Sequence, residues 1–282
     1  MFNNKTIFMK SKDFYLFIIA IGIFFSAFSQ QFQGIATYKT DRKIDLKMDS
    51  TSVNAEMQQQ IQAQLRKQFQ KEYTLSFNTS ESVYKEEESL AAPSPATTGG
   101  INIVISGNSD ILYRNIKTQE YSTQTEIMGK VFLIKDSLTK KDWKLEKETK
   151  NIGEYTCFKA TLTEEVTEQT FNSNNDDLEK VTKKRVTTAW YTPQIPVSNG
   201  PGEYWGLPGL ILEINDGEQS ILCSKIVLNP TKISIEAPDK GKVVTQEEFD
   251  AIKEKKNQEL MENLEDNHSK KDGNSFRIKI GG

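Results

Sequence analysis

Apolar and polar residues alternate in short runs along most of the chain, and this pattern predicts a β-sheet. Alternation with a period of two places successive side chains on opposite faces of a strand. Turn residues at 128–129, 151–153 and 215–217 separate neighbouring runs by a few positions, which favours an antiparallel meander over parallel βαβ units. The expected strands cover residues 34–40, 73–77, 82–85, 111–116, 120–127, 130–135, 143–150, 154–163, 181–191, 210–214 and 220–228.

Apolar residues recur every fourth position between residues 49 and 71, which is the period of one helix face. The stripe consists of Val53, Met57, Ile61, Leu65 and Phe69 in a segment otherwise rich in Gln and Lys. We expect this amphipathic helix to pack on the sheet. The alternative is a helix that binds a membrane surface or a partner protein.

A second helix is predicted to begin at Thr245 and to end near residue 265. Thr245 and Glu248 have the spacing of a capping box, in which each side chain accepts a hydrogen bond from the other residue's backbone N–H. The apolar edge of this helix is thin, so we expect it to dock loosely. That edge consists of Phe249, Ile252, Leu260 and Leu264.

These elements predict a mainly β protein of the α+β class, with one curved antiparallel meander sheet, the early helix and the loosely docked C-terminal helix. We expect residues 30–240 to form one sheet domain and residues 241–282 to form the C-terminal helix and a polar tail. Residues 86–100 are rich in Pro, Ala and Gly and predict a loop, and residues 164–180 predict a solvated hairpin tip. Residues 232–236 are expected to add a short edge strand, and residues 276–280 either add another or interact elsewhere.

The N-terminal residues predict export. Three lysines (Lys5, Lys10, Lys12) precede an apolar run at 14–25, and a small-x-small site ends at Ser29. This pattern is typical of a signal peptide over residues 1–29, with Met9 as an alternative start. The apolar run is shorter than the ~20 residues that a membrane anchor needs. We therefore expect a protein of the periplasm or of the outer-membrane periphery.

The net charge is −3, so the chain has no basic excess with which to hold phosphates, and a nucleic-acid partner is not expected. The only cysteines are Cys157 and Cys223, both in predicted strands. In an oxidising compartment they can pair as a disulfide, provided that their strands are neighbours. The alternative is that each is a small buried apolar residue.

Residues 193–209, here named the Pro/Gly loop, combine four prolines and four glycines with large apolar side chains. Proline cannot donate to a β-ladder, so a central strand is excluded there. Ile195, Val197, Tyr204, Trp205 and Leu207 indicate that the loop packs down on the core.

Aromatic residues flank and enter this loop, and they are candidates for the wall of a ligand groove. The alternative is that they serve only as core and loop packing. The candidate residues are Trp190, Tyr191, Tyr204, Trp205, Gly206, Leu207, Pro208, Gly209, Leu210 and Ile211.

Residues 206–211 read Gly-Leu-Pro-Gly-Leu-Ile, and longer blocks at 143–160, 189–196 and 200–214 carry the same likeness. With these blocks the chain resembles the GLPGLI family of exported proteins from Bacteroidota-type bacteria. The resemblance implies an envelope protein without an established activity, and it brings no catalytic residues. The strand-rich pattern is also similar to envelope proteins of the lipoprotein-carrier type, in which a curved half-barrel encloses an apolar groove.

His268 is the only histidine, so a multi-histidine metal site is excluded, and we expect neither a metal nor a cofactor. Glu203 and Glu213 are candidates for a glycosidase-type carboxylate pair. No spacing singles them out among the many Glu residues, so a solvent-facing or edge role for each is favoured. Our leading hypothesis is a noncatalytic exported protein that binds an apolar or extended ligand, a lipid or a peptide, or another envelope protein. The alternatives are a secreted hydrolase that uses paired carboxylates and a structural partner of an outer-membrane transporter.

Overall fold

The computed structural model describes five ranges of the chain and two isolated helical positions, Gln59 and Ala63. The ranges are 32–42, 70–87, 110–172, 177–268 and 279–280. The predicted signal peptide, most of the early helix and most of the loop at 86–100 therefore lie outside the described residues. The chain divides into two compact units, Met1–Phe32 and Gln33–Gly282, and every described strand belongs to the second unit.

The described residues form one 13-stranded sheet, which confirms the predicted mainly β fold. The strands are β1 (Gln33–Arg42), β2 (Glu72–Asn78), β3 (Glu81–Glu86), β4 (Ile111–Asn115), β5 (Glu120–Ile127), β6 (Lys130–Ser137), β7 (Lys144–Ile152), β8 (Tyr155–Asn172), β9 (Asp177–Thr192), β10 (Leu210–Asn215), β11 (Gln219–Leu228), β12 (Lys242–Val244) and β13 (Lys279–Ile280). Their order is β12-β6-β5-β4-β3-β2-β1-β11-β10-β9-β8-β13, with β7 also beside β8. The ladders are antiparallel except β12 with β6.

Two sequence-based expectations about strands are wrong. Residues 232–236 form no strand, because Asn229 adopts a left-handed conformation (φ 49°) and turns the chain away from the β1–β11 ladder. The expected strands at 154–163 and 181–191 are too short, since β8 and β9 stay paired to Asn172 and Asp177. The predicted hairpin tip between these two residues lies outside the described residues. Opposite charges face each other across this ladder, as at Glu164 and Arg185, so its polar composition is compatible with a strand pair.

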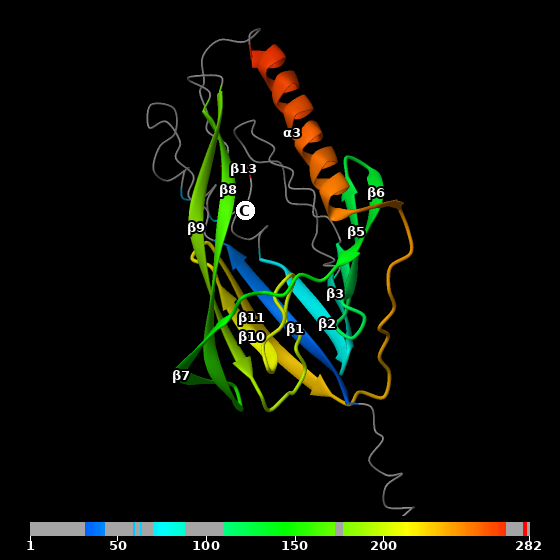
Figure 1. Cartoon of the computed structure of the whole chain (residues 1–282), viewed down its shortest axis with the longest axis vertical. Coiled ribbons are helices and arrows are strands. Elements are labelled where there is room, and N and C mark those ends of the chain that lie inside the picture. Colours follow the sequence, from blue (N-terminus) through cyan, green and yellow to red (C-terminus); the bar gives the residue numbers. More distant parts are fainter. Residues whose placement is uncertain are drawn as a thin grey trace, which may run out of the picture. The chain divides into compact units, whose positions relative to one another are not determined.

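The sheet curves around its inner face, which we define as the face that carries Ala36, Tyr38, Leu75 and Phe77, each 0% exposed. Five strands separate β4 from β9 in the sheet order, yet residues of both line one cleft. Figure 1 shows β8 and β9 on one side of this curve and β5 and β6 on the other, with β1, β2, β10 and β11 between them. The curvature brings side chains distant in sequence around a common space.

The Pro/Gly loop packs against the core, as its apolar residues predict. Ile195, Val197 and Leu207 are at most 1% exposed. The loop is fixed to its own strand by backbone bonds from Leu210 N–H to Ile195 O (3.0 Å) and from Ile211 N–H to Asn199 O (3.0 Å). Buried apolar side chains and satisfied backbone groups together make this loop a rigid wall.

Helix α3 (Gln246–His268) begins at the predicted capping box. Thr245 N–H donates to Glu248 Oε2 (3.0 Å), and Glu248 N–H donates to Thr245 Oγ1 (3.2 Å). The first turns of α3 dock on β6 and β12 through Phe249, with Ile252 packed beside it. Within the described part of the chain, no helix has the length and apolar character needed to cross a membrane.

Candidate functional site

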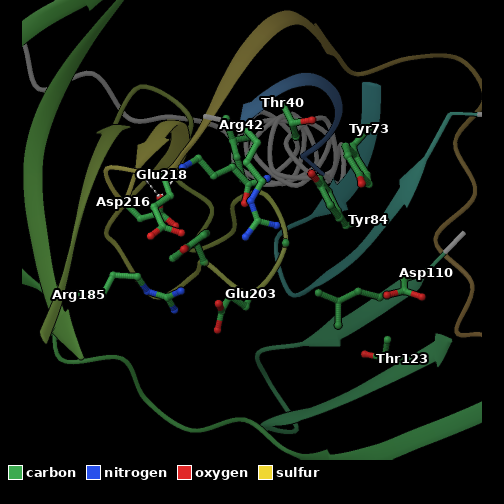
Figure 2. Close-up of a pocket in the computed structure, with 15 residues that line it drawn as sticks. Thr40, Arg42, Tyr73, Tyr84, Asp110, Thr123, Arg185, Glu203, Asp216 and Glu218 are labelled. Carbon is green, nitrogen blue, oxygen red and sulfur yellow. Dashed lines mark hydrogen bonds between the residues drawn. The ribbon is translucent and has the colours of Figure 1, made fainter. Parts of the chain in front are cut away.

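Two neighbouring clefts open on the inner face, with volumes of about 320 and 490 Å³. Leu112, Thr123 and Glu203 line both of them. We refer to the two clefts together as the inner groove. Figure 2 shows the first cleft, with Arg42, Tyr84, Arg185 and Glu203 among the side chains around it.

Strand register explains why these side chains share one face. Tyr84 on β3 lies opposite Leu112 on β4, and Leu112 lies opposite Thr123 on β5. Residues that are directly paired across a ladder point to the same face. The pairing therefore produces a row of side chains across three strands, and this row forms the floor where the two clefts meet.

The tip of the Pro/Gly loop supplies the opposite wall. Glu203 and Tyr204 line the first cleft, and Glu203 and Trp205 line the second. Lys141 holds this tip, because its Nζ lies 2.9 Å from Glu203 Oε2 and 5.7 Å from the centre of the Tyr204 ring. Trp143 Nε1–H donates to Trp205 O at 2.8 Å. The segment before β7 thus clamps the loop tip over the sheet.

Arg114, on β4, connects the sheet to the Pro/Gly loop through hydrogen bonds. Its side chain is buried, with 3% of the residue exposed. Nη2 donates to Gly202 O (2.7 Å), Nη1 donates to Asn199 Oδ1 (3.5 Å), and the guanidinium carbon lies 5.9 Å from the centre of the Trp205 ring. Desolvation lowers the pKa of Arg114 to about 10, and the charge of Glu203 partly opposes this. Arg114 nevertheless stays positively charged at neutral pH.

Tyrosines form one end of the first cleft. The rings of Tyr73 and Tyr84 stack with their centres 4.9 Å apart. Burial raises the pKa of Tyr73 to about 12 and that of Tyr204 to about 12, so both phenols are neutral at physiological pH and can donate hydrogen bonds. Asp110 keeps much of its surface exposed, yet desolvation by surrounding protein raises the pKa of its carboxyl.

Charges of both signs line the other end of the first cleft. Figure 2 shows Arg42 from β1, Arg185 from β9 and Glu203 from the loop directed toward the middle of the cleft. Asp216 and Glu218, from the turn between β10 and β11, lie beside them. The Nε atom of Arg185 is buried and has no hydrogen-bond partner among the described residues. The lining therefore combines charged groups of both signs with apolar surface, whereas the lipoprotein-carrier analogy implies an apolar groove.

The structure places the predicted groove residues in four different environments. Tyr204 and Trp205 line the clefts, whereas Trp190 lies outside their lining, with Lys150 Nζ 4.4 Å from its ring centre. Tyr191 is buried beside Phe158, with ring centres 6.1 Å apart. The signature residues at 206–211 serve the packing of the loop and line neither cleft; of these, Leu207, Leu210 and Ile211 are buried, and Gly206 and Pro208 are exposed.

Gly209 has a specific steric role in this signature. A Cβ atom at this position would lie 2.2 Å from Thr192 O, so the backbone at the end of β9 leaves no space for a side chain. Only glycine, which has no Cβ, fits at this position without displacing the backbone.

Glu203 and Glu213 do not form a carboxylate pair. Glu213 Oε2 lies 2.7 Å from Lys150 Nζ, and Glu213 lines neither cleft. Register explains the separation, because Glu213 lies opposite Trp190 and Leu222 while its neighbour Ile214 points into the core. A hydrolytic site built on these two residues is therefore excluded.

Cys157 and Cys223 are both free and buried, so the disulfide alternative is wrong for this structure. A disulfide needs Cα atoms within about 7 Å. The cysteines lie on β8 and β11, and β9 and β10 lie between these strands in the sheet. Burial raises the pKa of Cys157 to about 11 and that of Cys223 to about 12, so neither thiol is reactive at neutral pH.

Sequence reasoning missed Arg42, Tyr84, Arg114, Thr123 and Arg185 as groove residues. Strict alternation does place each of them on one face of its own strand. What the sequence does not show is the curvature of the sheet, which determines that residues of β1, β4 and β9 meet.

Comparison with known proteins finds a match to a family of unknown function over part of the chain, and distant structural similarities. Residues 143–213 match the family model described as a protein of unknown function (Porph_ging). No curated protein matches the chain. The stretch of the family match includes the Pro/Gly loop and its signature, so the wall of the groove falls within the matched region.

Two crystal forms of PNGF-II resemble the fold with TM-scores of 0.47 and 0.48 at 13% identity. Each match covers 78% of this chain but only 32% of the PNGF-II chain. LprF from Mycobacterium bovis has a TM-score of 0.24 at 8% identity, over 75% of this chain and 91% of its own. None of these similarities carries information on what the groove binds.

Proposed function

We propose that the protein is a noncatalytic binding protein of the cell envelope, and that the inner groove holds an extended polar ligand. The observation that carries the proposal is the continuity of the two clefts through Leu112, Thr123 and Glu203. A continuous groove fits an elongated molecule better than a compact one.

The lining favours a polar ligand over a lipid. An acyl chain in this groove would desolvate Arg185 and Glu203 without returning any hydrogen bonds, which is costly for charged groups. Tyr73, Tyr84 and Tyr204 instead combine flat ring faces with phenol groups, a combination that suits polar chains with both apolar and hydrogen-bonding surfaces.

An envelope location rests on the sequence. The N-terminal pattern over residues 1–29 has the features of an export signal, and the blocks around residues 206–211 resemble the GLPGLI family. A ligand in that compartment, or a partner protein that delivers it, is consistent with both features.

Filling the floor of the groove tests the proposal. Thr123→Trp places a large side chain where both clefts meet, and Glu126→Trp, at an exposed position on the same strand, is the matched control. Native mass spectrometry of protein isolated from its own envelope should show a bound mass that Thr123→Trp loses and Glu126→Trp keeps. A wild-type protein without any bound mass, or equal retention by Thr123→Trp, would contradict the proposal.

A secreted hydrolase is the second candidate, and Asp110 favours it. Its pKa is raised by desolvation, and it lines the first cleft together with Glu203. A carboxyl whose pKa is raised by desolvation holds its proton more readily, which is a property that a general acid needs. If the protein is a hydrolase, the wild type will convert the groove-bound ligand to smaller products and Asp110→Asn will leave it intact.

A further inference from the structure

Arg114 is a buried cation that forms no ion pair within the described part of the chain. A guanidinium group has five N–H donors. The hydrogen bonds to Asn199 Oδ1 and Gly202 O use two of them, and the Nε atom has no partner. Buried arginines are normally paired with an anion, so this side chain lacks an acceptor of opposite charge.

Asn199, which accepts a hydrogen bond from Arg114, also has a buried donor group without an acceptor. The Oδ1 atom of Asn199 accepts from Ser82 Oγ (3.1 Å) and from Arg114, while its Nδ2 atom is buried without a partner. Two buried donor groups without acceptors therefore lie side by side under the loop. Since buried donors are almost always satisfied, the pattern indicates an acceptor-only group that the described residues do not provide.

The other charged side chains of the second cleft already have partners. Lys141 binds Glu203 at 2.9 Å and Glu164 at 3.2 Å. Asp136 accepts the backbone N–H groups of Ser137 (2.7 Å) and Gln246 (3.2 Å), which hold the pKa of its carboxyl below the usual range. Arg114, which lines the same cleft, has no counter-charge in contact and keeps a buried donor, Nε, without a partner among the described residues.

We infer that Arg114 binds a single carboxylate group of the ligand that occupies the inner groove. The inference rests on the proposed function and specifies the chemistry of its ligand. A planar carboxylate matches the planar guanidinium in a bidentate contact. A doubly charged phosphate would meet the negative charges of Glu203 and Asp136 in the same cleft, and a single negative charge balances Arg114.

Acetate is the probe that tests this inference. The purified full-length protein is titrated with sodium acetate at constant ionic strength, with chloride as the replaced anion. Two signals report on the site: the ¹⁵N–¹H resonance of Arg114 Nε and the intrinsic tryptophan fluorescence, to which Trp205 beside the guanidinium contributes. We expect saturable changes in both signals with acetate, and no change with chloride alone. An absent acetate response, or tighter binding of phosphate or sulfate than of acetate, overturns the inference.

Two variants locate the response. Arg114→Gln should abolish the acetate response, and Lys150→Gln, which removes the cation from Trp190, should retain it. If Arg114→Gln does not fold, the wild-type Nε resonance decides alone, since it reports on this atom directly. An unchanged acetate response in folded Arg114→Gln contradicts the inference.

Different results contradict the carboxylate contact at Arg114 and the binding role of the inner groove. A bound mass that Thr123→Trp removes, together with no acetate response, overturns the carboxylate contact and leaves the groove as a binding site. A wild-type protein that binds acetate but never carries a larger ligand contradicts the proposed function.

Discussion

Two clusters in this protein place a cation over a tryptophan ring, and they differ in whether that cation also contacts an anion. In one, Lys150 lies over Trp190 and also binds Glu213 at 2.7 Å. In the other, Arg114 lies over Trp205 and has only neutral acceptors. The Lys150 cluster is a closed ion pair that needs nothing further, whereas the Arg114 cluster has a charge without a counter-charge in contact. We interpret the first as structural and the second as part of a binding site.

The same contrast holds for carboxyl groups. Glu81 accepts from Tyr113 Oη (2.6 Å) and from Asn78 Nδ2 (3.2 Å), and these bonds lower the pKa of its carboxyl. Asp110 in the groove has a pKa raised by desolvation. Hydrogen bonds thus stabilise the charged form of Glu81, whereas desolvation disfavours the charged form of Asp110. Carboxyl groups with a pKa raised by desolvation in a cleft are common at functional sites.

The largest expected effect comes from displacing the loop that covers Arg114. Gly209→Ala brings a methyl group against Thr192 O, a backbone atom that cannot rotate away. We expect a loss of about 3 kcal/mol in the free energy of unfolding, measured by urea denaturation. Gly129→Ala is the control, because its φ of +79° is strained but its Cβ meets open space, and it should cost about 1 kcal/mol. Equal losses for the two variants would show that the loop is not tightly seated.

Neutralising Arg114 should have a smaller effect than breaking a buried ion pair. Arg114→Gln removes the desolvated charge and keeps a donor near Gly202 O. We expect a change of about 1 kcal/mol in unfolding free energy, well below the roughly 3–5 kcal/mol lost when one partner of a buried pair is removed. A loss in that higher range, in the same urea assay, would indicate that Arg114 already has a counter-charge.

Breaking the Lys150 cluster should have a still smaller effect. Both side chains of the Lys150–Glu213 pair are partly exposed, so solvent screens their attraction. Glu213→Gln should cost about 0.5 kcal/mol at low salt, and the difference from wild type should disappear at high salt. If Glu213→Gln still lowered the unfolding free energy at high salt, the Lys150–Glu213 pair would not be screened by solvent, and exposure would not distinguish it from Arg114.

The two carboxyl groups should shift stability with pH in opposite directions. The lowered pKa of Glu81 gives stability that is present above its ordinary pKa of 4.5 and is lost as pH falls through the lowered value. The raised pKa of Asp110, from 3.8, favours the protonated folded state, so its effect is most favourable at low pH and is lost as pH rises.

The corresponding variants should therefore behave differently in denaturation at two pH values. Asp110→Asn is expected to be more stable than wild type at neutral pH and equal to it in acid. Glu81→Gln is expected to be less stable than wild type at neutral pH and to approach it in acid. If the stability of both variants relative to wild type changed with pH in the same direction, the carboxyl of Asp110 in the groove would not differ from that of Glu81.

Much of the fold follows from local patterns. Alternation predicted the strands from β1 to β11, and the spacing of Thr245 and Glu248 predicted the start of α3. The apolar residues of the Pro/Gly loop predicted its burial, because such side chains are stable only against a core. These features depend on neighbours in sequence, and a single chain shows them directly.

The groove depends on long-range geometry, which the sequence did not reveal. Arg114 reads as one polar residue in an alternating strand, and its burial arises only when Asn199 and Gly202 of the loop lie over it. Similarly, Glu203 and Glu213 looked equivalent, until register placed one in the groove and the other against Lys150. The sheet curvature and the loop path determine these contacts.

The most direct test is an experimental density map of the protein isolated from its own cells without removal of ligands. We predict non-protein density along the inner groove, with a carboxylate group in contact with Arg114 Nε. A carboxylate of the chain itself bound to Arg114, with the groove closed over it, would contradict the proposed binding site.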